Sequence, residues 1–223
     1  SRFAGMISMT KSRVAIAGAS GFVGRAVART LRDRFDVVGI ARSIPRDHAD
    51  FSEFRSADLF NLREAEAALA GAEVAIYLVH SMLPSARLTQ GVFSDFDLLC
   101  ADNFARAAAK AGVRQIVYLG GLIPEGALSP HLASRREVEQ TLSSHGVPVT
   151  VLRAGLVLGG GGSSFDMLAT LVRRLPVMVC PRWTETRTQA VALDDVIALL
   201  GHVVGRPECA GQTYDVGAPE VMT

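Results

Sequence analysis

The sequence is poor in cysteine, and its cysteines fit neither a disulfide framework nor a metal site. Only three occur in 223 residues, at positions 100, 180 and 209, and none belongs to a CxxC pair or to another metal-ligand spacing. An odd number of scattered thiols is typical of proteins kept in a reducing compartment. We therefore expect free, buried cysteines, no bound metal and a cytoplasmic protein.

Long apolar runs and blocks of one charge are also missing. No apolar stretch reaches the roughly 18–20 residues that cross a bilayer, and residues 1–10 lack the basic start and apolar segment of a secretory signal. The net charge is +1, with acidic and basic residues interspersed. Without a basic stripe or a polybasic block, we expect neither a nucleic-acid partner nor a membrane partner.

What the sequence does contain is a regular alternation of strand and helix patterns. Hydrophobic residues make up 49% and charged residues 20%, which suits a compact core. Expected strands cover residues 13–17, 36–42, 54–59, 74–80, 114–119, 149–153 and 212–216, with helical patterns between most of them. This alternation predicts an α/β fold, a Rossmann-type doubly wound parallel sheet with a small C-terminal substrate-side extension.

The same patterns suggest how the chain is divided. We expect a flexible lead over residues 1–12, a dinucleotide-binding core over 13–158, and a smaller C-terminal region over 159–223 that is interleaved with the core. The last residues resemble the approach to a further helix. A truncated chain and a trimmed single-domain form both remain open.

Polar residues mark several helix starts and one unusual helix position. Asn61, Ser129 followed by Pro130, and Asp194 all suit the N-cap of a helix. In the helix expected over residues 93–111, Asn103 falls on an otherwise apolar stripe with Phe96, Leu99 and Ala107. Two alternatives remain for Asn103: it bonds backbone groups, or a slightly different helix phase exposes it.

The turn after the first strand is glycine-rich and has the spacing of a dinucleotide-binding loop. Its residues are Gly18, Ala19, Ser20, Gly21, Phe22, Val23 and Gly24. In such a turn the first glycine permits a tight bend, the second lets backbone approach a pyrophosphate, and the third lets helix pack on strand. The N-terminus of the following helix offers unpaired N–H groups to the phosphates. The strand–turn–helix context therefore predicts nucleotide binding.

The end of the second strand indicates which dinucleotide is bound. An acidic residue there would bond the 2′-hydroxyl of the adenosine ribose and favour NAD. Residues 39–43 contain none, and Arg42 and Ser43 stand there instead. A guanidinium is well shaped for a 2′-phosphate, so we expect NADP, with NAD possible if Arg42 is merely a solvated side chain.

Several stretches, in order along nearly the whole chain, resemble the short-chain dehydrogenase/reductase superfamily in its extended and atypical branches. They are residues 18–24, 57–59, 111–119, 152–155 and 192–196. Residues 128–135 and 175–178 resemble an atypical subgroup whose members are described as NAD(P)-binding, epimerase/dehydratase-like or NmrA-like proteins. The resemblance implies that Asp58 and Leu59 approach the adenine, and that Val79, His80 and Ser81 lie along the cofactor.

The superfamily also implies a catalytic serine, tyrosine and lysine, and here the sequence departs from the pattern. Tyrosine and lysine normally lie four residues apart on one helical face, where tyrosine is the acid/base and lysine holds the nicotinamide ribose. At the aligned positions this chain has His131 and Arg135, and Gly120 and Gly121 stand where the serine is expected. No tyrosine in the chain has a lysine four residues later.

Two interpretations of His131 and Arg135 remain open. In the first they are the candidate catalytic pair: His131 moves a proton, since its ordinary pKa lies near working pH, and Arg135, which stays charged, bonds cofactor ribose or phosphate. In the second, His131 is a partly exposed residue in the first turn of a helix and Arg135 is a solvated or cofactor-contacting cation.

The C-terminal quarter adds two weaker candidates for a substrate site. The glycines at 159–162 precede an expected helix and form either an anion clamp or a mobile connection. Arg182, Trp183 and Arg187 would suit an acidic or aromatic substrate, or they lie on the surface.

Two functions follow from these observations. The first is an NADP-preferring oxidoreductase or epimerase-like enzyme that acts on an unknown small or nucleotide-linked substrate. The second is a non-catalytic NAD(P)-binding regulator or assembly factor, which the missing serine and tyrosine favour. The resemblance also implies a possible homodimer through the helices at 93–111 and 131–145.

Overall fold

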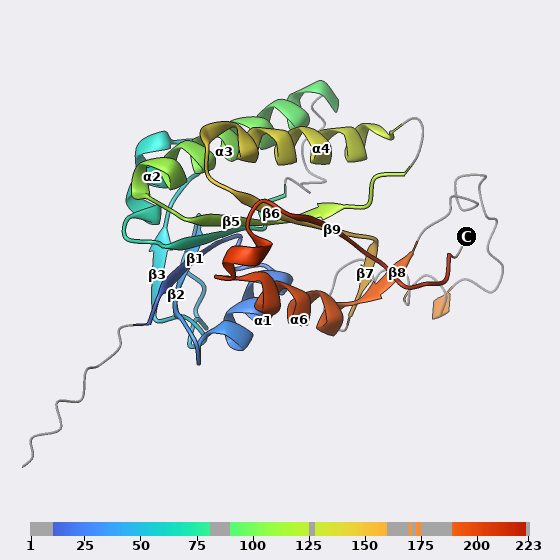
Figure 1. Cartoon of the computed structure of the whole chain (residues 1–223), viewed down its shortest axis with the longest axis horizontal. Coiled ribbons are helices and arrows are strands. Elements are labelled where there is room, and N and C mark those ends of the chain that lie inside the picture. The colour runs from blue at the N-terminus through green and yellow to red at the C-terminus, as the bar shows by residue number, and fades with distance from the viewer. Residues whose placement is uncertain are drawn as a thin grey trace, which may run out of the picture.

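The computed structural model describes residues 11–80, 90–124, 128–159, 170, 173, 174 and 189–221. Its main sheet has seven parallel strands in the order β3-β2-β1-β4-β5-β6-β9 (Figure 1). The strands are β1 (Arg13–Ala17), β2 (Asp36–Ala41), β3 (Glu53–Ser56), β4 (Val74–Tyr77), β5 (Gln115–Gly121), β6 (Val149–Ala154) and β9 (Thr213–Val216). The predicted Rossmann-type sheet is therefore confirmed.

Helices cover both faces of this sheet (Figure 1). One face carries α2 (Leu62–Leu69), α3 (Gln90–Ala111) and α4 (Pro130–Leu142), and the other carries α1 (Phe22–Leu31) and α6 (Leu193–Val203). Short 3-10 helices follow α4 at Ser143–His145 and α6 at Pro207–Cys209. Because both faces are covered, the central strands are apolar throughout rather than alternating, and all four residues of β4 are buried.

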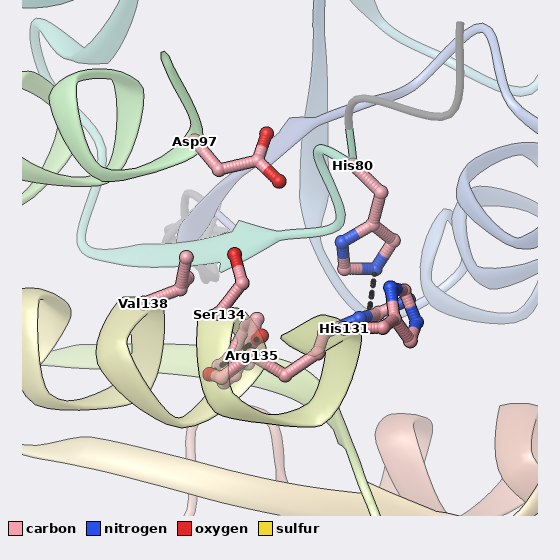
Figure 2. A pocket seen from close by; sticks show the side chains of 7 residues that line it. His80, Asp97, His131, Ser134, Arg135 and Val138 are labelled. Carbon is pink, nitrogen blue, oxygen red and sulfur yellow. Dashed lines mark hydrogen bonds between the residues drawn. The ribbon is translucent and has the colours of Figure 1, made fainter. Parts of the chain in front are cut away.

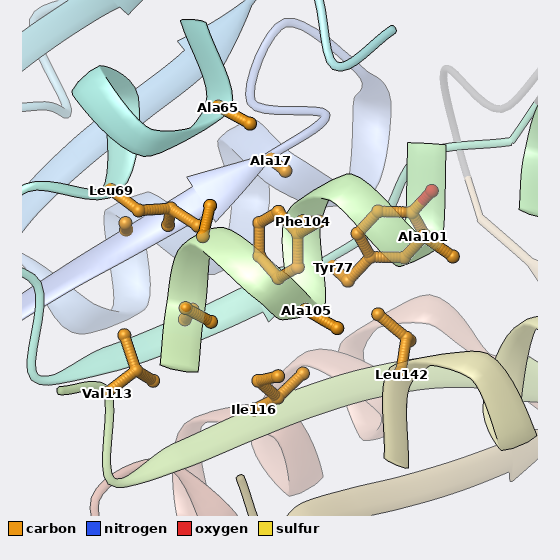
Figure 3. Packing of buried hydrophobic residues seen from close by; sticks show 14 of the residues in the cluster. Ala17, Ala65, Leu69, Tyr77, Ala101, Phe104, Ala105, Val113, Ile116 and Leu142 are labelled. Atoms are coloured by element: carbon orange, nitrogen blue, oxygen red, sulfur yellow. The ribbon is translucent and has the colours of Figure 1, made fainter. Parts of the chain in front are cut away.

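Two hydrophobic clusters hold the layers together, one on each face of the sheet. Beneath α2, α3 and α4, Phe104 packs edge-on against Tyr77 at 5.0 Å between ring centroids, and Leu69, Ile116 and Leu142 surround them (Figure 3). On the opposite face α1 and α6 bury the second cluster against the sheet.

The strand order reverses at β1, and this reversal determines where a ligand can bind. From β1 the sheet grows outward through β2 to β3, and the chain then returns to β4 on the other side of β1. In open α/β sheets ligands bind at such a switch point, outside the carboxyl ends of the strands. The turn at residues 18–24 and the segment after Tyr77 lie at this edge of β1 and β4.

Some predicted element boundaries are wrong. The third strand ends at Ser56, so Asp58 and Leu59 belong to the loop before α2, and the fourth strand ends at Tyr77, before Val79 and His80. Asp194 is not an N-cap: Ala192 holds that position, and Asp194 lies in the first turn of α6, where a carboxylate still interacts well with the helix dipole. Asn61 and Ser129 are confirmed as caps, through bonds from the N–H groups of Arg63 and Leu132.

A small second sheet was not predicted. It pairs β7 (Leu156–Leu158) with β8 (Ala190–Ala192) in parallel, directly after β6 and directly before α6. The backbones are close here, since a Cβ at Gly155 would lie 1.9 Å from the carbonyl oxygen of Gln189. Of the helix expected after the glycine loop, only residues 170, 173 and 174 are described, and they are helical. Most of the glycine loop and the candidates Arg182, Trp183 and Arg187 lie outside the described residues.

Two further predictions concern the cysteines and the membrane-crossing helices. Cys100 and Cys209 are free and buried, as expected, whereas Cys180 falls outside the described ranges. In the part of the chain that the structure describes, no helix combines the length and the apolar character needed to cross a membrane.

The predicted apolar stripe on α3 is wrong in its N-terminal part. Phe96 and Leu99 are exposed, whereas Asn103 and Ala107 are buried. Of the two alternatives for Asn103, the structure supports the first: its side-chain amide donates to the carbonyl oxygens of Leu59 at 2.9 Å and Phe60 at 3.1 Å. Asn103 therefore anchors the loop that follows β3 to the middle of α3.

Replacing Asn103 with alanine is expected to lower the free energy of unfolding by about 1–3 kcal/mol, because the buried carbonyl of Leu59 and the partly buried carbonyl of Phe60 lose this donor. Chemical denaturation measures the change. Arg106→Ala on the exposed side of the same helix is the matched control, since its ion pair with Asp102 at 3.7 Å is at the surface and contributes little. Equal effects of the two substitutions would contradict an anchoring role for Asn103.

Candidate functional site

The glycine turn forms a tight backbone cradle between β1 and α1. Gly18 has a φ of +85° and donates its N–H to the carbonyl oxygen of Ile40 at 3.1 Å. A Cβ at Gly18 would lie 2.9 Å from the carbonyl oxygen of Leu78, and one at Gly24 would lie 2.5 Å from the carbonyl oxygen of Gly18. Larger residues at either position would therefore force the turn open.

The N-terminus of α1 faces this cradle without a competing anion. Its N-cap is Gly21, no side chain caps the helix, and the first turn contains no acidic residue. Ser20 and Gly21 are exposed, whereas Ala19 and Gly24 are buried. The free backbone N–H groups and the helix dipole suit the pyrophosphate of a dinucleotide, so the residues present fit the cofactor that the sequence predicts.

A second group of candidates lies at the ends of β2 and β3. Arg42 and Ser43 are exposed, and Arg42 has no ion pair within the described part of the chain. The carboxylate of Asp58 accepts the N–H of Phe60 at 3.1 Å, which makes Asp58 part of a local turn, and Leu59 is buried.

Arg42 and Asp58 both lie close enough to the thiol of Cys100 to affect its pKa. Its pKa is raised to about 12, mainly by burial and further by the carboxylate of Asp58, while Arg42 acts in the opposite direction. Arg42, Asp58 and the middle of α3 therefore form one region.

A third group surrounds a small cavity between α3, α4 and the ends of β4 and β5 (Figure 2). The cavity has a volume of about 30 Å³ and is lined by His80, Asp97, Tyr118, His131, Ser134, Arg135 and Val138. Four of these residues come from α4 at spacings of three and four, which places them on one helical face. The structure thus brings the predicted pair His131 and Arg135 together with His80. A cavity of this size holds one or two waters or a few ligand atoms.

Arg135 is the best-connected residue of the cavity. Its Nη1 donates to Nε2 of His80 at 2.8 Å and makes a longer contact of 3.5 Å with the carbonyl oxygen of Leu119. Its own backbone carbonyl accepts the hydroxyl of Tyr118 at 3.3 Å. These contacts join β5 and the segment after β4 to the first turns of α4.

The cavity changes the acidity of its titratable side chains. Burial, reinforced by Arg135 and His131, lowers the pKa of His80 to about 3. Desolvation and Arg135 also lower the pKa of His131, while Asp97 acts against them. Burial raises the pKa of Tyr118 above its ordinary value. At neutral pH both histidines are therefore uncharged and Arg135 carries the positive charge of the cavity.

A side chain at the end of β5 would meet close neighbours. A Cβ at Gly120 would lie 3.1 Å from the ring of Tyr118, and one at Gly121 would lie 3.0 Å from a methyl group of Leu132. A serine at either position would therefore require Tyr118 or Leu132 to shift by a few tenths of an ångström.

The sequence interpretation missed four of the lining residues. Tyr118 is buried on β5, Asp97 lies near the N-terminal end of α3, and Ser134 and Val138 lie on α4. Only the two residues on α4 had a usable signal, because Ser134 follows His131 by three residues and Val138 follows Arg135 by three, which puts them on the same helical face. Of the earlier candidates, Val79 adjoins His80 beyond the end of β4, and Ser81 lies outside the described residues.

A glycine cradle at the switch point of a parallel sheet defines a Rossmann domain for a nicotinamide dinucleotide. The profile of the NAD(P)H-binding family matches residues 18–169, and the chain belongs to this family. Its fold is shared by solved structures such as MoeE5 in complex with UDP-glucuronic acid and NAD, with a TM-score of 0.76, 20% identity and coverage of 95% of this chain and 78% of that one. The same fold occurs in a short-chain dehydrogenase/reductase superfamily protein from Agrobacterium tumefaciens, with a TM-score of 0.73, 19% identity and coverage of 94% of this chain and 79% of that one.

The curated proteins that the chain matches have unlike names. The chain is 30% identical to ceramide reductase of Caulobacter vibrioides over 202 residues, 87% of this chain and 62% of that protein. It is 27% identical to auxiliary protein GraX of Staphylococcus aureus over 113 residues, 50% of this chain and 37% of that protein. An uncharacterized protein of Mycobacterium tuberculosis, Rv2047c, is 28% identical over 189 residues, 84% of this chain and 19% of that protein. The chain spans less than two thirds of the length of each.

Proposed function

We propose that this chain is the cofactor-binding part of an NADP-preferring oxidoreductase that acts on a carbonyl or hydroxyl group of a small substrate. The observation that carries the proposal is the cavity at the ends of β4 and β5, where His131, Arg135 and His80 converge. The glycine cradle lies on the adjacent strand β1. A dinucleotide whose pyrophosphate occupies the cradle has its adenosine half toward Arg42 and its other half toward this cavity.

The preference for NADP rests on Arg42. Its guanidinium is exposed at the end of β2 and has no carboxylate partner among the residues described. Because guanidinium groups bind phosphate in a bidentate manner, Arg42 suits the 2′-phosphate that distinguishes NADP from NAD. Ser43 adds a hydroxyl that can donate to the same group.

In this proposal the bound nicotinamide supplies or accepts a hydride, and the chain handles the proton. His131 lines the cavity, is exposed, and is uncharged at neutral pH because its pKa is lowered. A neutral imidazole accepts a proton from a substrate hydroxyl, and the protonated ring returns one to a carbonyl oxygen. Arg135 cannot exchange protons, so its role is to bind and orient acceptor oxygens.

A reductase is consistent with one curated relative, and a regulator with another. Ceramide reductase of Caulobacter vibrioides is named for a reduction, whereas GraX is named as an auxiliary protein. The absence of the expected serine and tyrosine, where Gly120, Gly121 and His131 stand, favours the second candidate, a non-catalytic NAD(P)-binding regulator. In that case the same cradle binds the dinucleotide, and contact with another protein depends on whether the dinucleotide is bound.

One combined experiment separates these candidates. Isothermal titration with NADPH, NADP, NADH and NAD measures cofactor affinity, and oxidation of NADPH over a panel of aldehydes and ketones measures turnover. Tight NADPH binding with turnover supports the oxidoreductase. Binding without turnover of any compound favours the regulator, and absence of binding refutes both.

A further inference from the structure

The contact between His80 and Arg135 pairs an uncharged base with a cation. Arg135 carries only hydrogen-bond donors, so Nε2 of His80 must accept the bond of 2.8 Å. The proton of the neutral ring is then on Nδ1. With a pKa of about 3, His80 keeps this state throughout the physiological range.

A neutral partner orients a guanidinium without cancelling its charge. Within the described ranges no carboxylate lies within ion-pair distance of Arg135, and its other side-chain contact is the carbonyl oxygen of Leu119. A partly buried cation held only by neutral acceptors is costly, and that cost is offset when a ligand oxygen binds it. The remaining N–H groups of Arg135 are therefore available to a ligand at the cavity.

We propose that His80 is a positioning residue, which holds the guanidinium of Arg135 toward the nicotinamide half of the bound dinucleotide. This inference rests on the proposed function above. Ribose hydroxyls and the carboxamide of that half provide acceptor oxygens, whereas the adenosine half lies over Arg42. The bond also fixes the tautomer of His80, so Nδ1–H is a second donor on the side of the ring that faces the cavity (Figure 2).

The first test examines the pair without any cofactor. Long-range proton–nitrogen correlation spectra distinguish the two histidine tautomers and follow protonation. The wild-type protein should show His80 as the Nδ1–H tautomer from pH 5 to pH 8. In Arg135→Leu the titration of His80 should move to higher pH, because a nearby positive charge is lost. An Nε2–H tautomer, or a wild-type titration near the ordinary histidine pKa, would overturn the proposed pair.

The second test measures what the pair does for binding. His80→Leu should lower the affinity for NADPH by about tenfold, in keeping with the loss of a well-placed hydrogen bond to a charged group. The fragment adenosine 2′,5′-bisphosphate, which lacks the nicotinamide half, should bind within twofold of wild type. His80→Gln retains a neutral acceptor for Arg135 and should restore NADPH binding to within threefold.

A double-variant cycle completes the test. If His80 acts through Arg135, the variant carrying both His80→Leu and Arg135→Leu binds NADPH no more weakly than Arg135→Leu alone. Additive losses, or equal weakening of the fragment, would overturn the inference and leave NADP binding intact. If the wild-type protein fails to bind NADPH, the proposed function is refuted instead, while the spectra still report on the pair.

Discussion

Replacing Arg42 with alanine is expected to lower the ratio of NADP to NAD affinity by roughly 30-fold, which corresponds to about 2 kcal/mol for a charged bond to phosphate. The reason is that Arg42 is exposed at the end of β2, with no acidic partner in the described part of the chain to occupy its guanidinium. Affinity for NAD should change little, because the ribose 2′-hydroxyl needs no cation. Isothermal titration of both cofactors measures the ratio.

A nearby arginine provides the control for this substitution. Arg46 is also exposed and lies four residues later, where it lines an open groove with Asp47, His48 and the start of β3. Arg46→Ala removes the same charge from the same loop and should leave the ratio within twofold. If Arg42→Ala leaves the ratio unchanged, or if both variants lower it equally, then the proposal that Arg42 binds the 2′-phosphate is wrong.

The fold could be predicted because its signals are local and repeated. Buried parallel strands are apolar along their whole length, as in β4, and most are followed by a helix pattern, in some cases with a recognisable start such as Ser129 with Pro130. Right-handed connections leave few ways to arrange such units. The strand ends were less predictable, because the regular pairing of a strand with its neighbours ends before the apolar pattern does. The ladder of β4 ends at Tyr77, and of the apolar residues that follow, Leu78 still donates its N–H to the carbonyl oxygen of Ala17 at 3.0 Å.

The face of α3 could not be predicted, for a compositional reason. The helix is rich in alanine, which fits both a buried and an exposed position, so several stripes of its surface look equally apolar. Phe96 and Leu99 appeared to mark the buried face, yet they are exposed and Phe96 packs edge-on against exposed Phe60 at 5.4 Å. Asn103 was the more informative residue, because a buried amide requires partners.

The candidate site was predictable where it lies on one element and unpredictable where it joins several. His131 and Arg135 share a face of α4 because they are four residues apart. The bond from Arg135 to His80 spans 55 residues of sequence, and no local pattern specifies it. The crowding at Gly120 and Gly121 likewise depends on Tyr118 and Leu132, which only the packed structure brings there.

Replacing His131 with glutamine is expected to lower turnover by about 10²–10⁴-fold, the usual contribution of a positioned acid or base. NADPH affinity should stay within threefold, because His131 is an exposed residue of the cavity wall and lies outside the glycine cradle. The steady-state rate of the substrate identified in the carbonyl panel gives the first quantity, and titration gives the second. His145, which ends the same helical segment and pairs with Asp102 at 2.7 Å, provides the matched control in His145→Gln.

The pH dependence distinguishes proton transfer from a steric effect of the substitution. The pKa of His131 lies below its ordinary value because of desolvation and Arg135. Carbonyl reduction needs the protonated ring, so its rate should fall as pH rises through that lowered pKa. Alcohol oxidation needs the neutral ring, so its rate should rise over the same range and level off by neutral pH. Both profiles should be flat in His131→Gln. A wild-type reduction rate that is independent of pH below 6.5 would exclude His131 as the proton donor. NADPH binding without turnover in the wild type and in every variant would instead favour the non-catalytic regulator.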